Sequence, residues 1–271
     1  RILLSNGTPV VAKDLIGKKF SILSFDKDWN QKPCSAMAFD NGIKPVFKIV
    51  TGDGKEIFRT DNHPLWTAKT RKTKNSKHAL LTVVGMGWKQ VSELTEDDVV
   101  AVPTKINTFR HIERNEDHIK LAAYLIADGG LTINVSFSKG EETKVRNEFE
   151  NIVIRMGGVV KPTSRSCTVR ISGDGIHYGP KSNPILNWVR EWGLFGKKSK
   201  YKRFPDWVWR LPDNQIGLFL NRLFSCDGWV YSKETNGKDK NKTEIGYSSV
   251  SKGMIDDVHL AALRLGIRGD I

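Results

Sequence analysis

The feature that most constrains the fold of this chain is an internal repeat in its second half. Residues 121–129, LAAYLIADG, and residues 220–228, LNRLFSCDG, both have a helical pattern and both end in Asp-Gly. Each is followed by strand-like residues and then by an amphipathic helix that ends in glycine, at Gly157 in the first copy and at Gly266 in the second. Two copies with the same order of elements predict a domain with pseudo-twofold symmetry.

An aspartate stands at the end of each repeated helix, Asp128 in the first and Asp227 in the second. The glycine after it is where a helix often needs a left-handed residue, so each carboxylate is expected at the negative end of the helix dipole. A carboxylate there is disfavoured by roughly 0.3–1 kcal/mol and requires a nearby cation. If the two helices pack side by side, the acids meet and can share Mg²⁺ with phosphate oxygens. For either motif alone an ordinary helix terminator is the better interpretation, whereas the pair favours a metal site.

The composition indicates a polyanionic partner. The chain has 271 residues, with 43 Lys and Arg against 30 Asp and Glu, a net charge of +13. Basic side chains that meet phosphates release condensed counterions, although a basic surface without a partner is the alternative. Cys34, Cys167 and Cys226 have no paired spacing, which argues against a disulfide scaffold and a zinc site. Cys34 is expected to be a small core residue within a strand.

No apolar run is long enough to span a bilayer and no signal-like segment is present at the start. We therefore expect a soluble protein of the cytoplasm that has no membrane partner and has access to DNA.

The chain divides into two halves with different patterns. Residues 1–108 contain short apolar runs separated by turn signals, which predicts an all-β domain with strands near 20–25, 45–50 and 99–102. The basic stretch 69–78 is expected to be a solvated loop or a phosphate-facing arm. Residues 109–271 predict an α+β domain, with one repeat at 115–195 and a second at 212–271. The helices expected there cover residues 117–127, 141–156, 184–192, 214–226 and 252–265, with strands near 159–162, 168–172 and 245–250.

The two Asp-Gly segments resemble the paired LAGLIDADG motifs of homing endonucleases. The resemblance implies αββαββ repeats whose motif helices form the interface, with the metal ligands carried over to Asp128 and Asp227. It also implies Mg²⁺ as cofactor, double-stranded DNA as substrate, and a monomer with pseudo-twofold symmetry. Arg222 departs from the pattern, because the family often has glycine at the tightest helix contact, so its side chain needs an exit from the interface.

A basic segment precedes the second motif. Residues 196–205, GKKSKYKRFP, resemble the corresponding segment of inteins that contain an endonuclease. By that resemblance Lys202 is the lysine that polarises the scissile phosphate or its attacking water, with Lys198 as the second candidate. The alternative, compatible with this role, is a basic loop that contacts DNA phosphates. The DNA-binding candidates of this segment are Lys197, Lys198, Lys200 and Arg203.

The first half contains a Thr-x-x-His motif. Thr60 and His63 can converge on one peptide bond across a turn, where neutral histidine can donate a proton to a leaving amide nitrogen. The motif alone is weak, and a histidine in a surface turn is the simpler interpretation. However, residues 1–15 and 87–100 resemble the sequence blocks that flank this motif in the Hint (protein-splicing) domain of inteins. The resemblance implies that Thr60 and His63 are catalytic and that flanking extein segments are partners.

The same resemblance leads us to expect further residues at both ends of the chain. The family places a Cys or Ser shortly before the position of Arg1 and a His-Asn pair at its C-terminus, and the 271 residues contain neither. Splicing as written is therefore not expected. Pseudo-symmetry separately predicts two further strands after Ile271, because two strand candidates follow the equivalent helix of the first repeat. Residues 204–228 resemble inteins of replicative DNA helicases.

The function expected from the sequence is metal-dependent, site-specific double-strand cleavage of DNA by an intein-encoded homing endonuclease. Two alternatives stay open. One is a DNA-binding module with a decayed endonuclease, and the other is an autoprocessing domain with a non-catalytic insertion.

Overall fold

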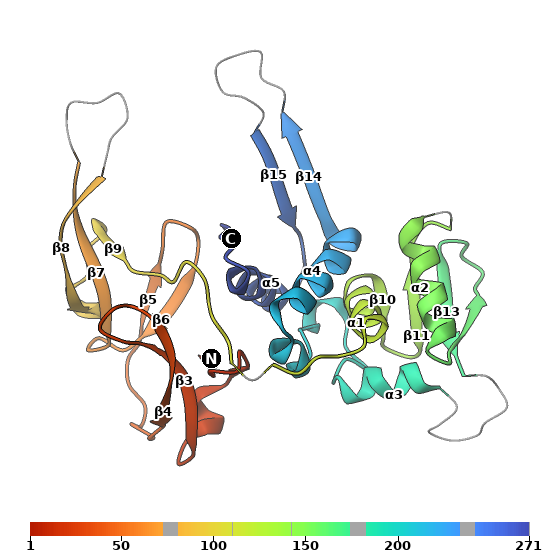
Figure 1. The fold of residues 1–271 in the computed structure, drawn as a ribbon, viewed down its shortest axis with the longest axis horizontal. Helices are drawn as coiled ribbons and strands as arrows, with labels where there is room; N and C mark the ends of the chain where they lie inside the picture. The colour runs from red at the N-terminus through yellow and green to blue at the C-terminus, as the bar shows by residue number, and fades with distance from the viewer. Residues whose placement is uncertain (73–80, 110, 142, 174–182, 234–241, 271) are drawn as a thin grey trace.

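The structure is a computed structural model, and it describes residues 1–72, 81–109, 111–141, 143–173, 183–233 and 242–270. Figure 1 shows a β-rich first half at one end of the molecule and a mixed second half, from green to blue, at the other. The chain passes between them through the segment that follows β9 (Asp98–Val100) and leads to α1 (Glu116–Asp128).

Every regular element described within residues 1–108 is a strand or a short 3-10 helix. The strands are β1 (Ile2–Leu3), β2 (Pro9–Val10), β3 (Lys19–Phe25), β4 (Gln31–Met37), β5 (Phe47–Val50), β6 (Glu56–Arg59), β7 (Pro64–Lys72), β8 (Leu81–Gln90) and β9. They form the antiparallel pairs β1-β2, β3-β4 and β5-β6, together with a three-stranded sheet in the order β8-β7-β9. The 3-10 helices are η1 (Ala12–Leu15) and η2 (Val91–Glu93). The prediction of β-structure is confirmed at this level, and the Hint fold itself stays a prediction.

Two expectations for the first half were wrong. Residues 69–72 do not form the solvated loop expected there but the end of β7, because their backbone pairs with the apolar strand β8 across a bulge at Lys69 and Thr70. The alternative, a phosphate-facing arm, stays a prediction. Residues 73–78 of that stretch lie outside the described residues. Cys34 does lie within a strand, opposite Ile22, but it is exposed because β4 is exposed along residues 32–35 and does not enter the core.

The second half contains the five helices expected from its periodicity. They are α1, α2 (Lys144–Arg155), α3 (Pro184–Glu191), α4 (Asp213–Asp227) and α5 (Lys252–Arg264). The strands are β10 (Gly129–Gly130), β11 (Val135–Ser138), β12 (Val159–Pro162), β13 (Thr168–Ser172), β14 (Gly228–Lys233) and β15 (Lys242–Tyr247). Short 3-10 helices occur at η4 (Ser199–Tyr201) and η5 (Asp206–Arg210). Helix α2 begins at Lys144, later than expected, because the Thr143 side chain caps it by accepting from the amide of Arg146 at 3.2 Å.

The order helix, strand, strand, helix occurs twice in this half. The first occurrence is α1-β10-β11-α2 and the second is α4-β14-β15-α5. In the first, β12 and β13 complete a sheet in the order β10-β11-β13-β12, whereas β14 and β15 form a two-stranded sheet. Strand β15 begins three residues before the expected position, because its register places Tyr247 opposite Gly228.

The hydrophobic core lies in the second half. Helix α1 is buried on every face between Leu121 and Ile126, and Ile119 is buried as well. Helix α4 packs against α1 and adds Ile216, Phe219 and Leu223, all fully buried. Burial of this apolar surface is the main favourable term for folding this half.

The glycines that end the motif helices do not have the left-handed conformation expected from the sequence. Gly129 has φ −78° and Gly228 has φ −83°, both extended, because each helix runs directly into a strand. Glycine is required at both positions for another reason, because the preceding turn of each helix lies too close to leave room for a side chain. A Cβ at Gly129 would lie 2.2 Å from the carbonyl oxygen of Leu125, and one at Gly228 would lie 2.5 Å from that of Phe224.

Candidate active site

The two predicted acidic residues lie at the ends of packed helices. Asp128 is the last residue of α1 and Asp227 is the last residue of α4. Lys139, directly after β11, joins the two ends: its Nζ donates to Asp128 Oδ2 at 2.7 Å and to the carbonyl oxygen of Cys226 at 3.0 Å. The helix dipoles place negative potential at this point, so a cation here is stabilising.

Asp227 is half-buried and close enough to Asp128 for the two charges to repel. Burial raises the pKa of Asp227, and the charge of Asp128 raises it further. The hydroxyl of Tyr247 donates to Asp227 Oδ2 at 3.4 Å, which partly offsets both effects. Two carboxylates that repel each other in this way are stabilised by a divalent cation that both can bind.

Lys202 is buried, with 3% of its surface exposed, beside both acids. Its ammonium donates to the carbonyl oxygens of Leu125 at 3.1 Å, Ile126 at 2.8 Å, Ala127 at 3.4 Å and Gly129 at 2.7 Å. It therefore caps the C-terminus of α1, where the sequence predicted a compensating cation. Burial lowers the pKa of Lys202 to about 8, although Asp227 and Asp128 favour its charged form.

A small cleft opens beside these groups. It has a volume of about 200 Å³ and is lined among others by Lys202, Asp227, Tyr247 and Ser249. Its lining brings together a carboxylate, a lysine and hydroxyl groups, which suits a charged ligand.

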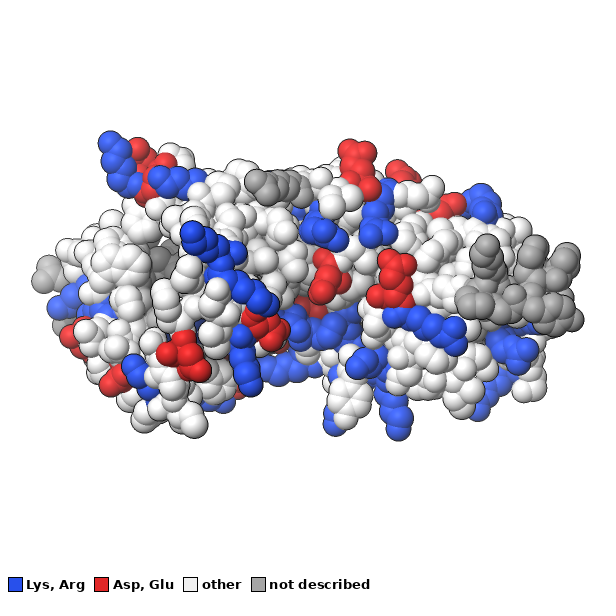
Figure 2. Space-filling model, turned by 90° about the horizontal axis from the view of Figure 1, so that it is seen from below, with Lys and Arg blue, Asp and Glu red and all other residues white. Residues whose placement is uncertain are grey.

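The remaining basic candidates divide into two groups. Lys197, Lys198 and Lys200 are exposed on the segment before and within η4. Arg203 instead pairs with Asp257 of α5, its Nε lying 2.7 Å from Oδ2, and the Asp257 side chain is 3% exposed. Figure 2 shows Lys and Arg side chains gathered around the middle of the face seen from below, beside a smaller number of acids.

Sequence reasoning missed Lys139 and Tyr247. Strand register relates the two repeats here, because Gly129 lies opposite Phe137 and Gly228 lies opposite Tyr247. Tyr247 therefore corresponds to Phe137, and Ser249 to Lys139. The only signal in the sequence was a single lysine two residues after the apolar strand residue Phe137. The strand register is needed to recognise that this lysine lies near the ends of both motif helices.

Thr60 and His63 lie in the first half, on the turn between β6 and β7. Thr60 Oγ1 donates to Asn62 Oδ1 at 3.0 Å, and the amide of His63 donates to the Thr60 carbonyl at 3.2 Å. Burial, and then the charge of Arg59, lower the pKa of His63, so its imidazole is neutral near pH 7. Within the described residues, no hydrogen bond joins either side chain to the start of the chain.

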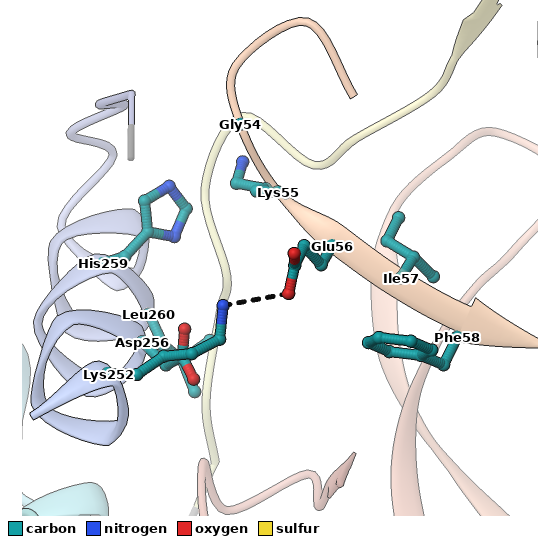
Figure 3. Close-up of a pocket in the computed structure, with 9 residues that line it drawn as sticks. All are labelled: Gly54, Lys55, Glu56, Ile57, Phe58, Lys252, Asp256, His259 and Leu260. Atoms are coloured by element: carbon teal, nitrogen blue, oxygen red, sulfur yellow. Dashed lines mark hydrogen bonds and ion pairs between the residues drawn. The ribbon is translucent and has the colours of Figure 1, made fainter. Parts of the chain in front are cut away.

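A larger cavity lies between the halves and contains none of the predicted site residues. It has a volume of about 470 Å³ and separates the β5-β6 hairpin from α5 (Figure 3). Lys252 reaches across it to Glu56 at 3.1 Å, and Lys48 contacts the same carboxylate at 2.6 Å. His259 also lines this cavity (Figure 3).

Residues 214–271 match the family model described as a LAGLIDADG-like domain. The chain is similar to the replicative DNA helicase DnaB of Rhodothermus marinus, with 27% identity over 98% of this chain and 27% of the relative. It is similar to the protein RecA of Mycobacterium tuberculosis strain H37Rv, with 25% identity over 84% of this chain and 26% of the relative. It is also similar to DnaB of Nostoc sp. strain PCC 7120, with 25% identity over 99% of this chain and 29% of the relative. The chain thus spans little more than a quarter of the length of these relatives.

The matched region contains α4, Asp227, β14, β15 and α5, and it supports a nuclease kind of activity. No helix in the described part of the chain is both long and apolar enough to cross a membrane.

Proposed function

We propose that the second half of this chain, residues 109–271, is a metal-dependent homing endonuclease that makes site-specific double-strand breaks in DNA. The observation that carries the proposal is the convergence of Asp128 and Asp227 at the ends of two packed helices, with Lys139 and Lys202 beside them. The LAGLIDADG-like match over the second helix supports the same activity.

The donor set fits Mg²⁺. The protein ligands that we propose are Asp128 and Asp227, and among the described residues no group of three or more His, Cys, Asp and Glu side chains could hold a metal. Mg²⁺ commonly takes one or two carboxylates and completes its shell with water and phosphate oxygens. When bound, it would stabilise charge on the scissile phosphate and activate water.

The lysines would hold the acids and the DNA. Lys139 orients the Asp128 carboxylate and fixes it to the end of α4. We propose that Lys202 acts on the scissile phosphate or its attacking water from the cleft, and its four carbonyl contacts support an additional structural role. Lys197, Lys198 and Lys200 would contact DNA phosphates, and the Arg203 pair with Asp257 would fix that segment to α5.

The test uses a supercoiled plasmid that carries an uninterrupted helicase gene of the DnaB type. With Mg²⁺ the wild-type chain should linearise it, whereas Asp227→Asn should bind the plasmid and leave it intact. Asp117→Asn is the matched control, because Asp117 lies at the other end of α1 and pairs with Arg155. Cleavage by Asp227→Asn at the wild-type rate, or cleavage that chelation does not stop, would refute the assignment. Binding without cleavage by the wild type would instead support a decayed, DNA-binding module.

We further propose that residues 1–108 belong to a protein-splicing domain in which Thr60 and His63 assist peptide-bond cleavage at a junction with an extein. The neutral imidazole of His63 on the same turn as Thr60 supports this role. A fusion that places an extein and a cysteine before Arg1 should release the extein in a thiol buffer, and His63→Ala should stop the release. Equal release from both proteins would remove the proposed role of His63.

A further inference from the structure

The side chain of Arg222 forms an ion pair between the two repeats. Arg222 lies on α4, where the sequence indicated a tight contact with α1, and its guanidinium leaves that contact toward α2. Its Nε lies 2.8 Å from Glu148 Oε2 and its Nη2 lies 3.0 Å from Oε1. The two parallel bonds give the pair a fixed, planar geometry.

The carboxylate of Glu148 also contacts two side chains of α1. The hydroxyl of the buried Tyr124 donates to Glu148 Oε2, and the ammonium of Lys120 lies 3.5 Å from Oε1. One carboxylate of α2 therefore joins α1 of the first repeat to α4 of the second. Burial disfavours the charge of Glu148, but the bonds from Arg222 and Tyr124 outweigh it and hold the pKa of Glu148 below its ordinary value.

This contact lies close to the acids along both helices. Tyr124 is one turn before Asp128 on α1, and Arg222 is about one and a half turns before Asp227 on α4. A rotation or shift of α4 against α1 would therefore change the contact and the spacing of the two carboxylates together. Metal affinity depends steeply on how such outer contacts orient the ligands.

We propose that the Arg222–Glu148 pair is a positioning element that sets the spacing of Asp128 and Asp227 for metal binding. The proposal rests on the endonuclease function proposed above. The side chains are 25% and 30% exposed, so water still reaches the pair and its contribution to global stability is smaller than that of a fully buried pair. The main consequence of losing the pair is therefore a changed metal site and not an unfolded protein.

The chain contains a matched control. Arg155 pairs with Asp117 through the same two-bond geometry, at 2.7 Å and 2.8 Å, but that pair joins α2 to α1 within the first repeat and does not involve α4. Arg155→Met removes an equivalent charge and an equivalent ion pair without releasing α4.

The experiment compares Arg222→Met, Glu148→Gln, Arg222→Lys and Arg155→Met by the Mg²⁺ concentration that gives half-maximal plasmid cleavage. Loss of the pair should raise this concentration about tenfold in both Arg222→Met and Glu148→Gln. A purely electrostatic effect would move the two variants in opposite directions, because one loses a positive charge and the other a negative charge. Arg222→Lys should recover part of the loss, and Arg155→Met should match the wild type.

A second measurement does not depend on cleavage. Spin labels at Glu116 on α1 and Asn214 on α4, both exposed, are introduced with Cys34, Cys167 and Cys226 replaced by serine. Arg222→Met should shift or broaden the distance distribution between the labels, and Arg155→Met should not. An unchanged distribution in Arg222→Met would overturn the positioning role. If the proposed nuclease activity fails, no variant cuts DNA at any Mg²⁺ concentration while the distance still responds to Arg222.

Discussion

The two halves of this molecule differ in how deeply their apolar side chains are buried. In the second half, helices and sheet share one core that contains large side chains with almost no exposure, such as Trp209 and Phe219. In the described part of residues 1–108, the buried apolar side chains are Leu15, Val91 and Ile106, and the amide of Ile106 already bonds to Leu263 of α5. Strand formation alone therefore does not produce a core, because the apolar faces of several elements must also meet.

The first half instead leaves many large apolar side chains in contact with solvent. Trp88 is 66% exposed and Phe39 is 74% exposed. Part of this surface is organised, since Trp66 lies between Trp29 and Trp88, with ring centroids 5.3 Å and 5.2 Å away. The stabilisation gained from burial is thus concentrated in the half that holds Asp128 and Asp227.

Core truncation should show the largest difference between the halves. Phe219→Ala removes a fully buried ring of α4 and should cost about 3–5 kcal/mol of unfolding free energy. Trp88→Ala removes a mostly exposed ring and should cost about 0.5–1.5 kcal/mol, the value of its edge contact with Trp66. Urea unfolding measures both, followed by circular dichroism at a helical wavelength for Phe219→Ala and at a strand wavelength for Trp88→Ala. Equal losses would show that the first half shares the core of the second.

The same contrast explains what the sequence predicted well. Helices α1 and α4 have a strong pattern and small residues, so their existence and their terminal aspartates were predictable. The conformation of Gly129 and Gly228 was not, because the direct passage from helix to strand depends on sheet pairing. The position of Lys139 at the ends of both helices also depends on tertiary packing.

Arg222 and Arg203 show a further limit of sequence reasoning. The sequence indicated that Arg222 needs an exit from the helix interface, but the identity of Glu148 as its partner follows only from the packing of α2. Likewise, a basic segment cannot reveal that Arg203 turns inward to Asp257 while the lysines near it are exposed.

Gly7 tests the contact through which the first half docks on the second. It has φ +89°, and an added Cβ would lie 2.6 Å from the carbonyl oxygen of Trp209 and 3.4 Å from the buried guanidinium of Arg264. Gly7→Ala should cost about 2–4 kcal/mol, the sum of a left-handed residue and an overpacked contact. Thermal unfolding monitored by Trp fluorescence measures the loss.

Gly17 provides the control for Gly7. Its φ is +72°, but nothing lies within 4 Å of an added Cβ. Gly17→Ala should therefore cost only the backbone term, about 1–2 kcal/mol. Equal losses of unfolding free energy in the two variants would show that the turn at Gly7 is packed less closely against the second half than in the structure.

His118 makes the stability of the second half depend on pH. It lies among Trp188, Trp192 and Trp207, with ring centroids 5.0, 5.0 and 5.4 Å away. Burial, and then the charge of Arg114, lower its pKa to about 4 from an ordinary value of 6.5. The folded state therefore binds this proton less readily than the unfolded state, so stability is full above pH 6.5 and is lost as pH falls toward 4.

The expected loss from His118 is about 1–2 kcal/mol after allowance for its partial exposure. Thermal midpoints between pH 7 and pH 4 should fall less steeply in His118→Phe than in the wild type, whatever the midpoint at pH 7. Parallel curves for the two proteins would show that protonation of His118 does not contribute to acid destabilisation.

The smallest expected effect concerns the polar contact across the cavity between the halves. Lys252 of α5 lies 3.1 Å from Glu56 of β6, with its side chain 71% exposed, and Glu56 also contacts Lys48 within the β5-β6 hairpin. An exposed ion pair gains little because water screens the charges and two long side chains lose freedom, so Lys252→Met should cost less than about 1 kcal/mol. The same reasoning predicts that the loss disappears in high salt.

Lys48→Met serves as the control, because it leaves the contact between the halves in place. A loss of several kcal/mol in Lys252→Met alone, independent of salt, would mean that the first half depends on α5 far more than its exposed surface indicates.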